Sequence, residues 1–462
     1  MSRPTPQELD QRGRAARKQV GRRSHAACPG PAGRPDPLAL LRAQDEARAP
    51  ELLGLRYARM AASPFTFLRG SAAVMAADLA ATPTTPLSTQ LCGDAHVLNI
   101  ETFATPERRL VFDITDFDET LRGPFEWDLK RMTASLVVAA RDRGFDTEVA
   151  DEAIYRCLAR YRTTMREHRD ADVLDVWYAS IGERDVLSVL GALVDDGELG
   201  SELLTTTHEI FDKARKRTSK RAAGRLTEEV DGRLQMREEP PVLSRDVLPD
   251  DRHDLASRFL EGYLTSLPAH RRTLLARFEV VDVARRVVGV GSVGTRCYVI
   301  LLHGRDADDP LVLQVKEAGP SVLEPYADVT GARPHGRRVV EGQRTMQTVS
   351  DIFLGWVSTV GPDGVERDFY VRQFRNMKGK VDLEDLDAEG LVAFADLCGH
   401  LLADAHARGG HPAELAGYLG KSDGIIEALI SFSHDYADLT ERDHRALLAA
   451  IDAGKVPYEP ED

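Results

Sequence analysis

Residues Val287–Leu302 read VVGVGSVGTRCYVILL, a stretch with G-x-G-x-x-G spacing. This spacing occurs in two unrelated phosphate-binding turns: one begins a helix, and the other connects two antiparallel strands. The residues after the last glycine, TRCYVILL, are mostly β-branched, aromatic or aliphatic, which favours a strand over a first helical turn. The stretch therefore predicts a glycine-rich hairpin whose ligand-binding residues are Gly289, Gly291, Ser292 and Gly294.

A second apolar run, Leu311–Val315, follows a turn and ends at Lys316. A dinucleotide site has an acid about twenty residues after its glycines, and this chain has Lys316 at about that separation. A lysine at the end of the strand after a glycine hairpin is the protein-kinase arrangement, in which the ammonium binds the α- and β-phosphates of ATP. On these residues alone, tight-turn glycines and a solvent-exposed lysine on an edge hairpin fit equally well.

The composition is that of an ordinary globular protein, with 462 residues, 42% hydrophobic and 29% charged. The length predicts about two or three domains or lobes. No apolar run approaches the roughly 20 residues that cross a bilayer, and the N-terminus lacks the apolar core of a secretory signal. We therefore expect a cytoplasmic protein with no membrane partner. The scattered cysteines, without C-x-x-C spacing, suggest neither a disulfide framework nor a zinc site.

The net charge of −14 argues against a general nucleic-acid binder, but two stretches are basic. Residues 1–50 are expected to form a basic, mobile N-terminal segment. Residues 213–225, KARKRTSKRAAGR, have a helical pattern, for which a solvated helix face is favoured over a patch that binds phosphate or an anionic substrate.

The acids of the predicted site lie in residues 91–131, LCGDAHVLNIETFATPERRLVFDITDFDETLRGPFEWDLKR. Asp94 and Asn99 are five residues apart, and Asp116 follows an apolar strand. Phosphoryl transfer needs a carboxylate at the attacking hydroxyl, an amide and a carboxylate for Mg²⁺, and a cation on the phosphates. This segment supplies the first three. A surface loop rich in acids is the weaker alternative, because five positions have the right order and chemistry.

The spacing in this segment resembles that of small-molecule kinases of the aminoglycoside phosphotransferase and choline kinase type, whose catalytic loop reads H-G-D-x-H-x-x-N. The resemblance implies that Asp94 is the catalytic base and that His96 is the loop histidine. It also implies that Asn99 and Asp116 are the magnesium ligands.

Three further positions bear on this resemblance. Cys92 replaces the first histidine of the loop, a residue that supports the loop without touching the phosphate. Asp118 replaces the glycine of D-F-G, and we assign it as a third metal ligand, with an acid on a turn as the alternative. Asp128, in GPFEWDL, matches a family pattern and is expected to brace the catalytic loop from the helix beneath it.

The order of these parts is rotated relative to an ordinary kinase, in which the glycine loop, the lysine and a helix glutamate precede the catalytic loop. Here they follow it. An amphipathic helix is predicted at Gly336–Val349, with Glu341 in reach of Lys316 as its ion-pair partner. Glu317 is the rival partner, but adjacent strand residues point to opposite faces.

The remaining kinase-like parts come later in the chain. Strands are predicted at 352–360 and 369–374, as a hairpin that ends at the hinge where the adenine would lie, beside Gln373. The apolar helix at 391–407 resembles the long helix of the larger kinase lobe. A circular permutation accounts for this order, because termini at surface loops can be relocated without disturbing the core.

The predicted fold is thus α+β: a two-lobed, protein-kinase-like fold that is circularly permuted. After the N-terminal segment, we expect a larger lobe with the catalytic loop and a helical substrate region, a nucleotide-binding lobe, and C-terminal helices that return to the larger lobe. The expected ranges are 51–280, 281–378 and 379–462.

Over almost its whole length the chain resembles a bacterial family known as domain of unknown function 2252. The resemblance is carried by SPFTFLRG (Ser63–Gly70), LCGDAHVLN, VVGVGSVGTRCYVILL, LQVKEA and HPAELAGYLGKSD. Within the first of these, Arg69 is either a contact to phosphate or substrate or a helix-flanking arginine paired with a nearby acid.

The expected function is an ATP- and Mg²⁺-dependent phosphotransferase that acts on a hydroxyl of a small-molecule or protein acceptor. One alternative is transfer of AMP by the same fold with ATP bound in reverse. Another is an ATP-binding pseudokinase that regulates a partner, although a module that only binds nucleotide has no need of Asp94 as a base. We expect selectivity for the acceptor to arise in residues 150–280.

Overall fold

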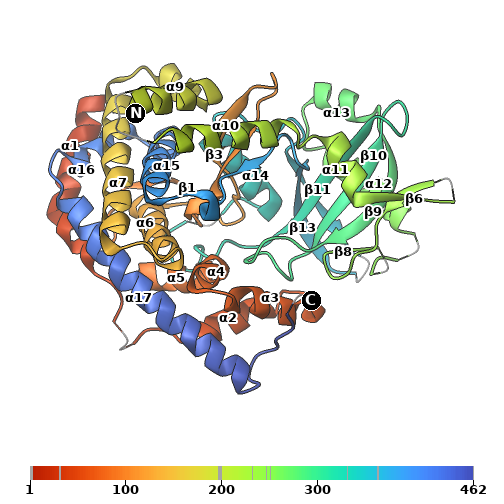
Figure 1. Cartoon of the computed structure of the whole chain (residues 1–462), viewed down its shortest axis with the longest axis horizontal. Coiled ribbons are helices and arrows are strands. Elements are labelled where there is room, and N and C mark those ends of the chain that lie inside the picture. The colour runs from red at the N-terminus through yellow and green to blue at the C-terminus, as the bar shows by residue number, and fades with distance from the viewer. Residues whose placement is uncertain are drawn as a thin grey trace.

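The glycine-rich stretch forms a turn between antiparallel strands, as predicted. β9 (Glu279–Arg286) pairs with β10 (Cys297–His303), which pairs with β11 (Pro310–Ala318). This computed structural model describes residues 4–30, 33–195, 200–231, 233–245, 247–249, 251–329, 331–361 and 364–460. It has a mostly helical lobe beside a lobe built on a twisted sheet (Figure 1).

The large sheet has the strand order β12-β13-β11-β10-β9-β8. Its other strands form the predicted hairpin and a short edge: β12 (Gly355–Val360), β13 (Glu366–Gln373) and β8 (Leu243–Ser244). Both faces of β11 are buried. Leu313 and Val315 pack with the helices on one face, so that Lys316 lies on the other.

Helices cover both faces of this sheet. α12 (Arg252–Leu264) and α13 (Ala269–Leu275) pack on the Val315 face. α11 (Ser219–Leu226) and α14 (His335–Met346) pack on the opposite face. A hairpin of β6 (Thr227–Val230) and β7 (Arg233–Met236) lies beside α11. Elements that pack on this sheet or pair with it thus begin at α11, ahead of the expected range 281–378.

The helical lobe is built around α6 (Glu126–Asp142), which is buried along nearly its whole length. Packed with it are α4 (Pro64–Gly70), α5 (Ala72–Ala80), α7 (Thr147–Asp170), α15 (Ala388–Gly409), α16 (Pro412–Leu419) and α17 (Gly424–Asp452). α3 (Leu53–Ala61) packs on α4 and α17. At its edges lie α2 (Pro37–Asp45), α8 (Val173–Tyr178), α9 (Glu183–Asp195) and α10 (Ser201–Arg215). No helix in the described ranges is both long and apolar enough to cross a bilayer.

Two small sheets of this lobe position the predicted acids. The first pairs β1 (Ser88–Leu91) with β4 (Leu121–Pro124). The second has the order β14-β2-β3-β5, made by Gly379–Lys380, Ile100–Ala104, Leu110–Ile114 and Ile181–Gly182. The catalytic loop leaves β1 and enters β2, and the acids at 116–118 follow β3.

The expected mobile N-terminal tail is wrong for the described residues of this segment. α1 (Pro6–Gln19) begins with a capping box made by Thr5 and Glu8, and it packs against α16. Arg17 and Arg22 donate hydrogen bonds to carbonyls at the C-terminal end of α16. These two arginines thus cap the C-terminal end of α16, where the helix dipole favours positive charge.

The contact of α1 with α16 depends on Gly13, because a Cβ at this position would overlap the carbonyl oxygen of Glu414. Alanine normally stabilises a helix relative to glycine. Here we expect Gly13→Ala to lower the free energy of unfolding by about 1–3 kcal/mol, since the helices would have to separate. Gly21→Ala, with open space at its Cβ, is the matched control. Chemical denaturation measures both, and equal stability of the two variants would contradict the packing.

Candidate active site

Lys316 and two aspartates from the helical lobe form the centre of the site. The Lys316 Nζ lies 3.3 Å from Asp116 Oδ1 and 2.5 Å from Asp118 Oδ2, across 200 and 198 residues of sequence. The Lys316 side chain is 4% exposed. Burial lowers its pKa, but the charges of Asp116 and Asp118 outweigh burial and hold the pKa above its usual value. The two segments thus meet, as predicted, through a buried ammonium.

Asp116 is held in a charged state and an uncommon backbone conformation. Burial raises the pKa of Asp116, but the positive charges of Lys316 and Arg372 lower it by more than burial raises it. The net shift of the pKa is therefore downward. Its φ of 67° lies in the left-handed region, which few non-glycine residues occupy. Such outliers cluster at functional sites, where the surroundings stabilise them.

The predicted ion pair between Glu341 and Lys316 is wrong. Glu341 is 45% exposed and pairs with Arg337 on the surface of α14. Asp118 takes the role expected of Glu341, because it binds Lys316 through one carboxylate oxygen and the Tyr370 hydroxyl through the other. Both oxygens of Asp118 thus have a partner, and its assignment as a third metal ligand stays a prediction.

Glu317 faces away from Lys316, as the strand alternation predicted. Its carboxylate pairs with Arg296 and Arg367. The side chains of α14 and its C-cap that line the cavity beside Lys316 are the amides of Gln343 and Gln347.

The loop predicted to be catalytic is held by Asp128 of α6, which confirms the predicted bracing contact of this residue. The Asp128 carboxylate accepts hydrogen bonds from the amides of Cys92, at 2.8 Å, and Gly93, at 3.0 Å. His406, from α15, lies 3.2 Å from the same carboxylate. Gly93 has a φ of 85°, and a Cβ here would overlap the Glu119 carbonyl, so the turn requires glycine.

The loop presents three of the predicted residues to a cavity. The Asp94 Oδ1 accepts a hydrogen bond from Arg131 Nε at 2.8 Å. The Asn99 Nδ2 donates to the Asp94 backbone carbonyl at 2.7 Å, so the amide nitrogen of Asn99 faces the loop. His96 is buried, and this burial lowers its pKa to about 4, so the imidazole is neutral near pH 7.

Two cavities meet at Asp116, Gly289 and Ser292. The Lys316 cavity, of about 370 Å³, also has Gln314, Arg372 and Gln373 in its wall. The Asp94 cavity, of about 740 Å³, also contains His96, Asn99 and Asp118. A group bound at Asp116 would therefore be accessible from both the Lys316 cavity and the Asp94 cavity.

The glycine turn is held from outside by Ala49 and by residues of α3 and α4, a role that the sequence did not suggest. Arg59 donates to the Gly289 carbonyl at 2.7 Å, and the Ala49 amide donates to the Gly294 carbonyl at 2.8 Å. A Cβ at Gly291 would lie 3.0 Å from the Arg69 carbonyl, so the turn approaches α4 closely. The predicted glycines thus permit this contact, and Ser292 lines both cavities.

Arg69 lines the Asp94 cavity, and its surroundings argue against the helix-flanking alternative. It forms no ion pair or side-chain hydrogen bond with any described residue, and its Nε is buried without a partner. Burial lowers its pKa, while the charges of Asp94 and Asp116 oppose that shift. A guanidinium in this state is suited to an anionic ligand.

At the other end of β13, Gln373 donates from its side chain to Ser219 Oγ at 2.9 Å and from its amide to Asp351. Its side chain is thus fixed at the wall of the Lys316 cavity, where the hinge was predicted. Sequence analysis did not assign the arginines that also line this cavity, Arg217, Arg286, Arg372 and Arg375. Arg217 lies in the basic stretch 213–225, so that stretch is not only a solvated helix face.

Comparison with known families identifies the chain. Residues 48–450 match the model of the family described as "uncharacterized protein conserved in bacteria (DUF2252)". Because the match covers most of the chain, the protein belongs to this family, as its motifs suggested. Comparisons with curated proteins and with solved structures gave no match.

Because Lys316 pairs with Asp118 and not with Glu341, we expect neutralising substitutions of these two acids to differ in their effect on stability. Asp118→Asn removes a charge that stabilises a buried ammonium, and we expect it to lower the free energy of unfolding by about 1–3 kcal/mol. Glu341→Gln, on the exposed face of α14, should change stability by less than about 0.5 kcal/mol. Chemical denaturation of both variants measures this, and a larger loss in Glu341→Gln would restore the original assignment.

Proposed function

We propose that the protein is an ATP- and Mg²⁺-dependent phosphotransferase that acts on a hydroxyl group of a small molecule or a protein. The observation that carries this proposal is the contact of Lys316 with Asp116 beneath a glycine-rich turn and beside Asp94. A cation for phosphates, a carboxylate for a metal and a carboxylate for the acceptor are the groups that phosphoryl transfer requires.

In this proposal the nucleotide lies in the Lys316 cavity and the acceptor in the Asp94 cavity. Lys316 binds the α- and β-phosphates, with Asp118 and Tyr370 holding its position. Asp94, fixed by Arg131, orients the acceptor hydroxyl and receives its proton. Arg69 contacts the transferred phosphate, which lies where the two cavities meet.

Asn99 and Asp116 are the residues suited to Mg²⁺. The Asn99 carbonyl oxygen accepts the Thr115 amide at 2.7 Å, which keeps Asn99 next to Asp116 in space. Mg²⁺ is usually bound by one or two carboxylates together with substrate phosphates, so a complete protein cage is not needed. The described residues contain no cluster of three or more His, Cys, Asp or Glu side chains that could hold a metal ion by themselves. When bound, the ion would neutralise charge on the phosphates.

The same proposal includes a circularly permuted kinase-like fold. Its support is the sequence of parts: an antiparallel sheet with a glycine turn and a lysine, a helix packed on that sheet, and a second lobe with the acids. In this chain the acids come first.

Transfer of AMP is the second candidate function. The observation that favours it is a second group of cations in the Lys316 cavity, Arg217, Arg286 and Arg375, because a triphosphate bound in the reverse direction would also contact positive charge. An ATP-binding pseudokinase is the third possibility, and Asp94 at the mouth of the second cavity counts against it.

Binding of Mg·ATP should depend on the residues assigned to phosphate and metal. We expect Mg·ATP to raise the melting temperature of the wild-type protein, because a ligand that binds only the folded state stabilises it. Lys316→Ala or Asp116→Asn should remove most of this rise, as should EDTA, whereas Asp94→Asn should keep most of it. Thermal unfolding with and without Mg·ATP measures the effect. An equal loss in all three variants would show that the roles are wrongly divided.

The products distinguish phosphoryl from AMP transfer. Incubation with Mg·ATP and a mixture of candidate hydroxyl acceptors should give ADP and a phosphorylated product by ³¹P nuclear magnetic resonance, and mass spectrometry should find a phosphate adduct. Asp94→Asn should lower the rate at least about a hundredfold, because general-base catalysis contributes that much. AMP with pyrophosphate or an AMP adduct would support the second candidate instead.

A further inference from the structure

The Lys316 cavity is also lined by a second group of cations, Arg217, Arg286 and Arg375. The strand register gives the separation of Arg375 from Lys316. The Phe374 amide donates to the Val312 carbonyl at 2.8 Å, and the four residues of strand from Val312 to Lys316 span about 13 Å. The backbone of Arg375 follows Phe374. Arg286 follows Arg285, which pairs with Tyr298, so its backbone lies two strands from Lys316, across β10.

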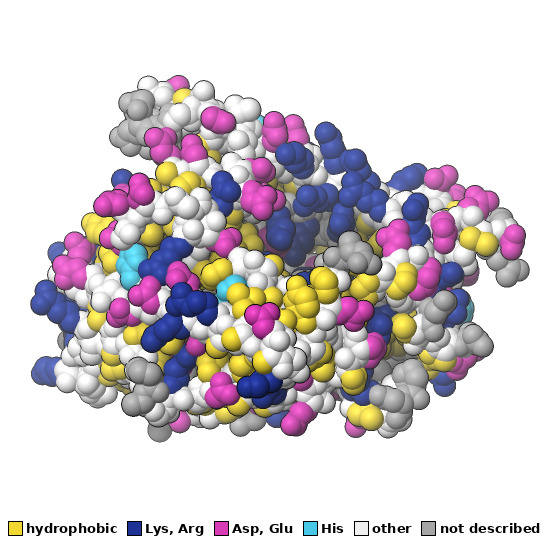
Figure 2. All heavy atoms as spheres, turned by 60° about the horizontal axis from the view of Figure 1, so that its bottom comes forward, with side chains coloured by type: hydrophobic (Ala, Val, Ile, Leu, Met, Phe, Trp, Pro, Cys, Tyr) yellow, Lys and Arg dark blue, Asp and Glu magenta, His cyan; other side chains and the backbone are white. Residues whose placement is uncertain are grey.

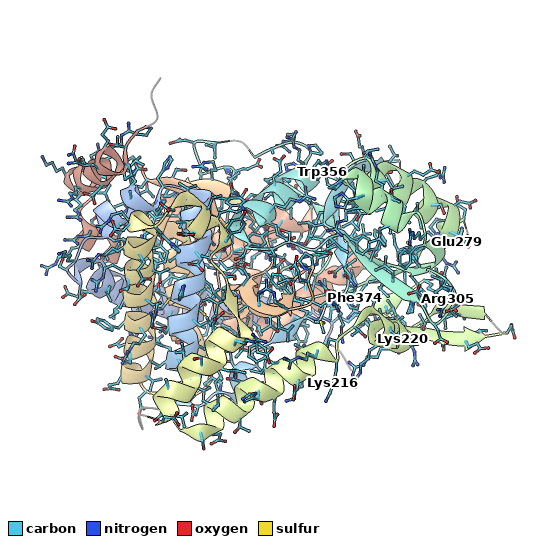
Figure 3. All side chains as sticks on the ribbon, turned by 90° about the horizontal axis from the view of Figure 1, so that it is seen from above. Lys216, Lys220, Glu279, Arg305, Trp356 and Phe374 are labelled. Atoms are coloured by element: carbon cyan, nitrogen blue, oxygen red, sulfur yellow. The ribbon has the colours of Figure 1, made fainter. Side chains whose placement is uncertain are left out.

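These arginines gather around one aromatic ring. The guanidinium carbons of Arg286 and Arg375 lie 4.9 and 5.5 Å from the centre of the Phe374 ring. Arg217 adjoins them, because its carbonyl accepts the Met377 amide at 2.9 Å. Phe374 lies between the helical lobe and the sheet (Figure 3). Figure 2 shows Lys and Arg side chains gathered around a hollow in the molecular surface.

The charge of this group is poorly compensated. Neither Arg286 nor Arg375 forms an ion pair with a described residue, and the Arg286 Nε is buried without a partner. Burial lowers the pKa of Arg375, and the charges of Arg286, Arg217 and Arg225 lower it further. The charge of Glu239 opposes the lowering of the Arg286 pKa that burial causes.

Two other cations of the same cavity have acidic partners. Lys316 has two aspartates, and Lys378 pairs with Glu101. Clustered like charges without acids destabilise a folded protein, and Arg375 also has a left-handed φ of 56°. A ligand that supplies negative charge removes the repulsion. Planar guanidinium groups with free donors are suited to the oxygens of a phosphate.

We infer that Arg217, Arg286 and Arg375 form a second phosphate-binding site, which takes a phosphate on the ribose of a nucleotide whose 5′-phosphates lie at Lys316. The inference rests on the proposed function, because it takes the Lys316 cavity as the nucleotide site. It adds a ligand class: nucleotides phosphorylated both on the 5′ chain and on a ribose hydroxyl.

The test compares AMP with adenosine 3′,5′-bisphosphate, which differ by one ribose phosphate, using isothermal titration calorimetry on the full-length protein. The wild-type protein should bind the bisphosphate at least tenfold more tightly. Arg375→Gln and Arg286→Gln should each remove most of this preference. Lys220→Gln is the matched control, because Lys220 is an exposed neighbour that pairs with Asp308, and it should keep the preference. Melting temperatures without ligand establish that the variants are folded.

Three results would overturn the inference: no preference in the wild-type protein, a preference that persists in both arginine variants, or a gain reproduced by AMP with free inorganic phosphate. A loss of ATP affinity in Arg375→Gln as large as that for the bisphosphate would also overturn it, because the arginines would then hold the triphosphate itself. If ATP does not bind while the arginine-dependent preference persists, the proposed function fails and the second phosphate site stands.

Discussion

The buried ammonium of Lys316 is the constraint on which the arrangement of the two lobes depends. A lysine on a strand covered on both faces is costly unless carboxylates meet it, and the acids come from the segment after β3 in the other lobe. Arg338 of α14 fixes that segment by donating to the carbonyls of Asp118 and Thr120. Helix α14 therefore supports Lys316 through the backbone of its partner, in place of a glutamate.

The parts that could be predicted from the sequence are those set by local pattern. Glycine spacing followed by β-branched residues gave the turn and strands around Lys316, and strand alternation placed Glu317 on the opposite face. The bracing of the catalytic loop by Asp128 followed from a motif in which the loop and the next helix lie close in sequence. Each of these depends on a few neighbouring residues.

The parts that were missed depend on contacts between distant segments. The partner of Lys316 depended on the rotation of α14, whose buried face carries Val339, Val340, Gln343 and Met346, so that Glu341 points outward. That buried spacing is visible in the sequence and could have excluded Glu341. By contrast, no local pattern indicates that the N-terminal basic residues cap α16, because the acceptor carbonyls lie about four hundred residues away. Composition alone suggested a tail.

The separation of Lys316 from its partners has a consequence for synthesis on the ribosome. The acids at 116 and 118 are made first, and Lys316 follows about two hundred residues later. A nascent chain that ends soon after β3 thus carries carboxylates without their cation, and the sheet that supplies it closes only when β13 has emerged. Helices α15 and α17, which cover α6 and α7, come later still. The helical lobe therefore cannot reach its final packing before α17 has been translated, although the strands of the large sheet are complete at the end of β13.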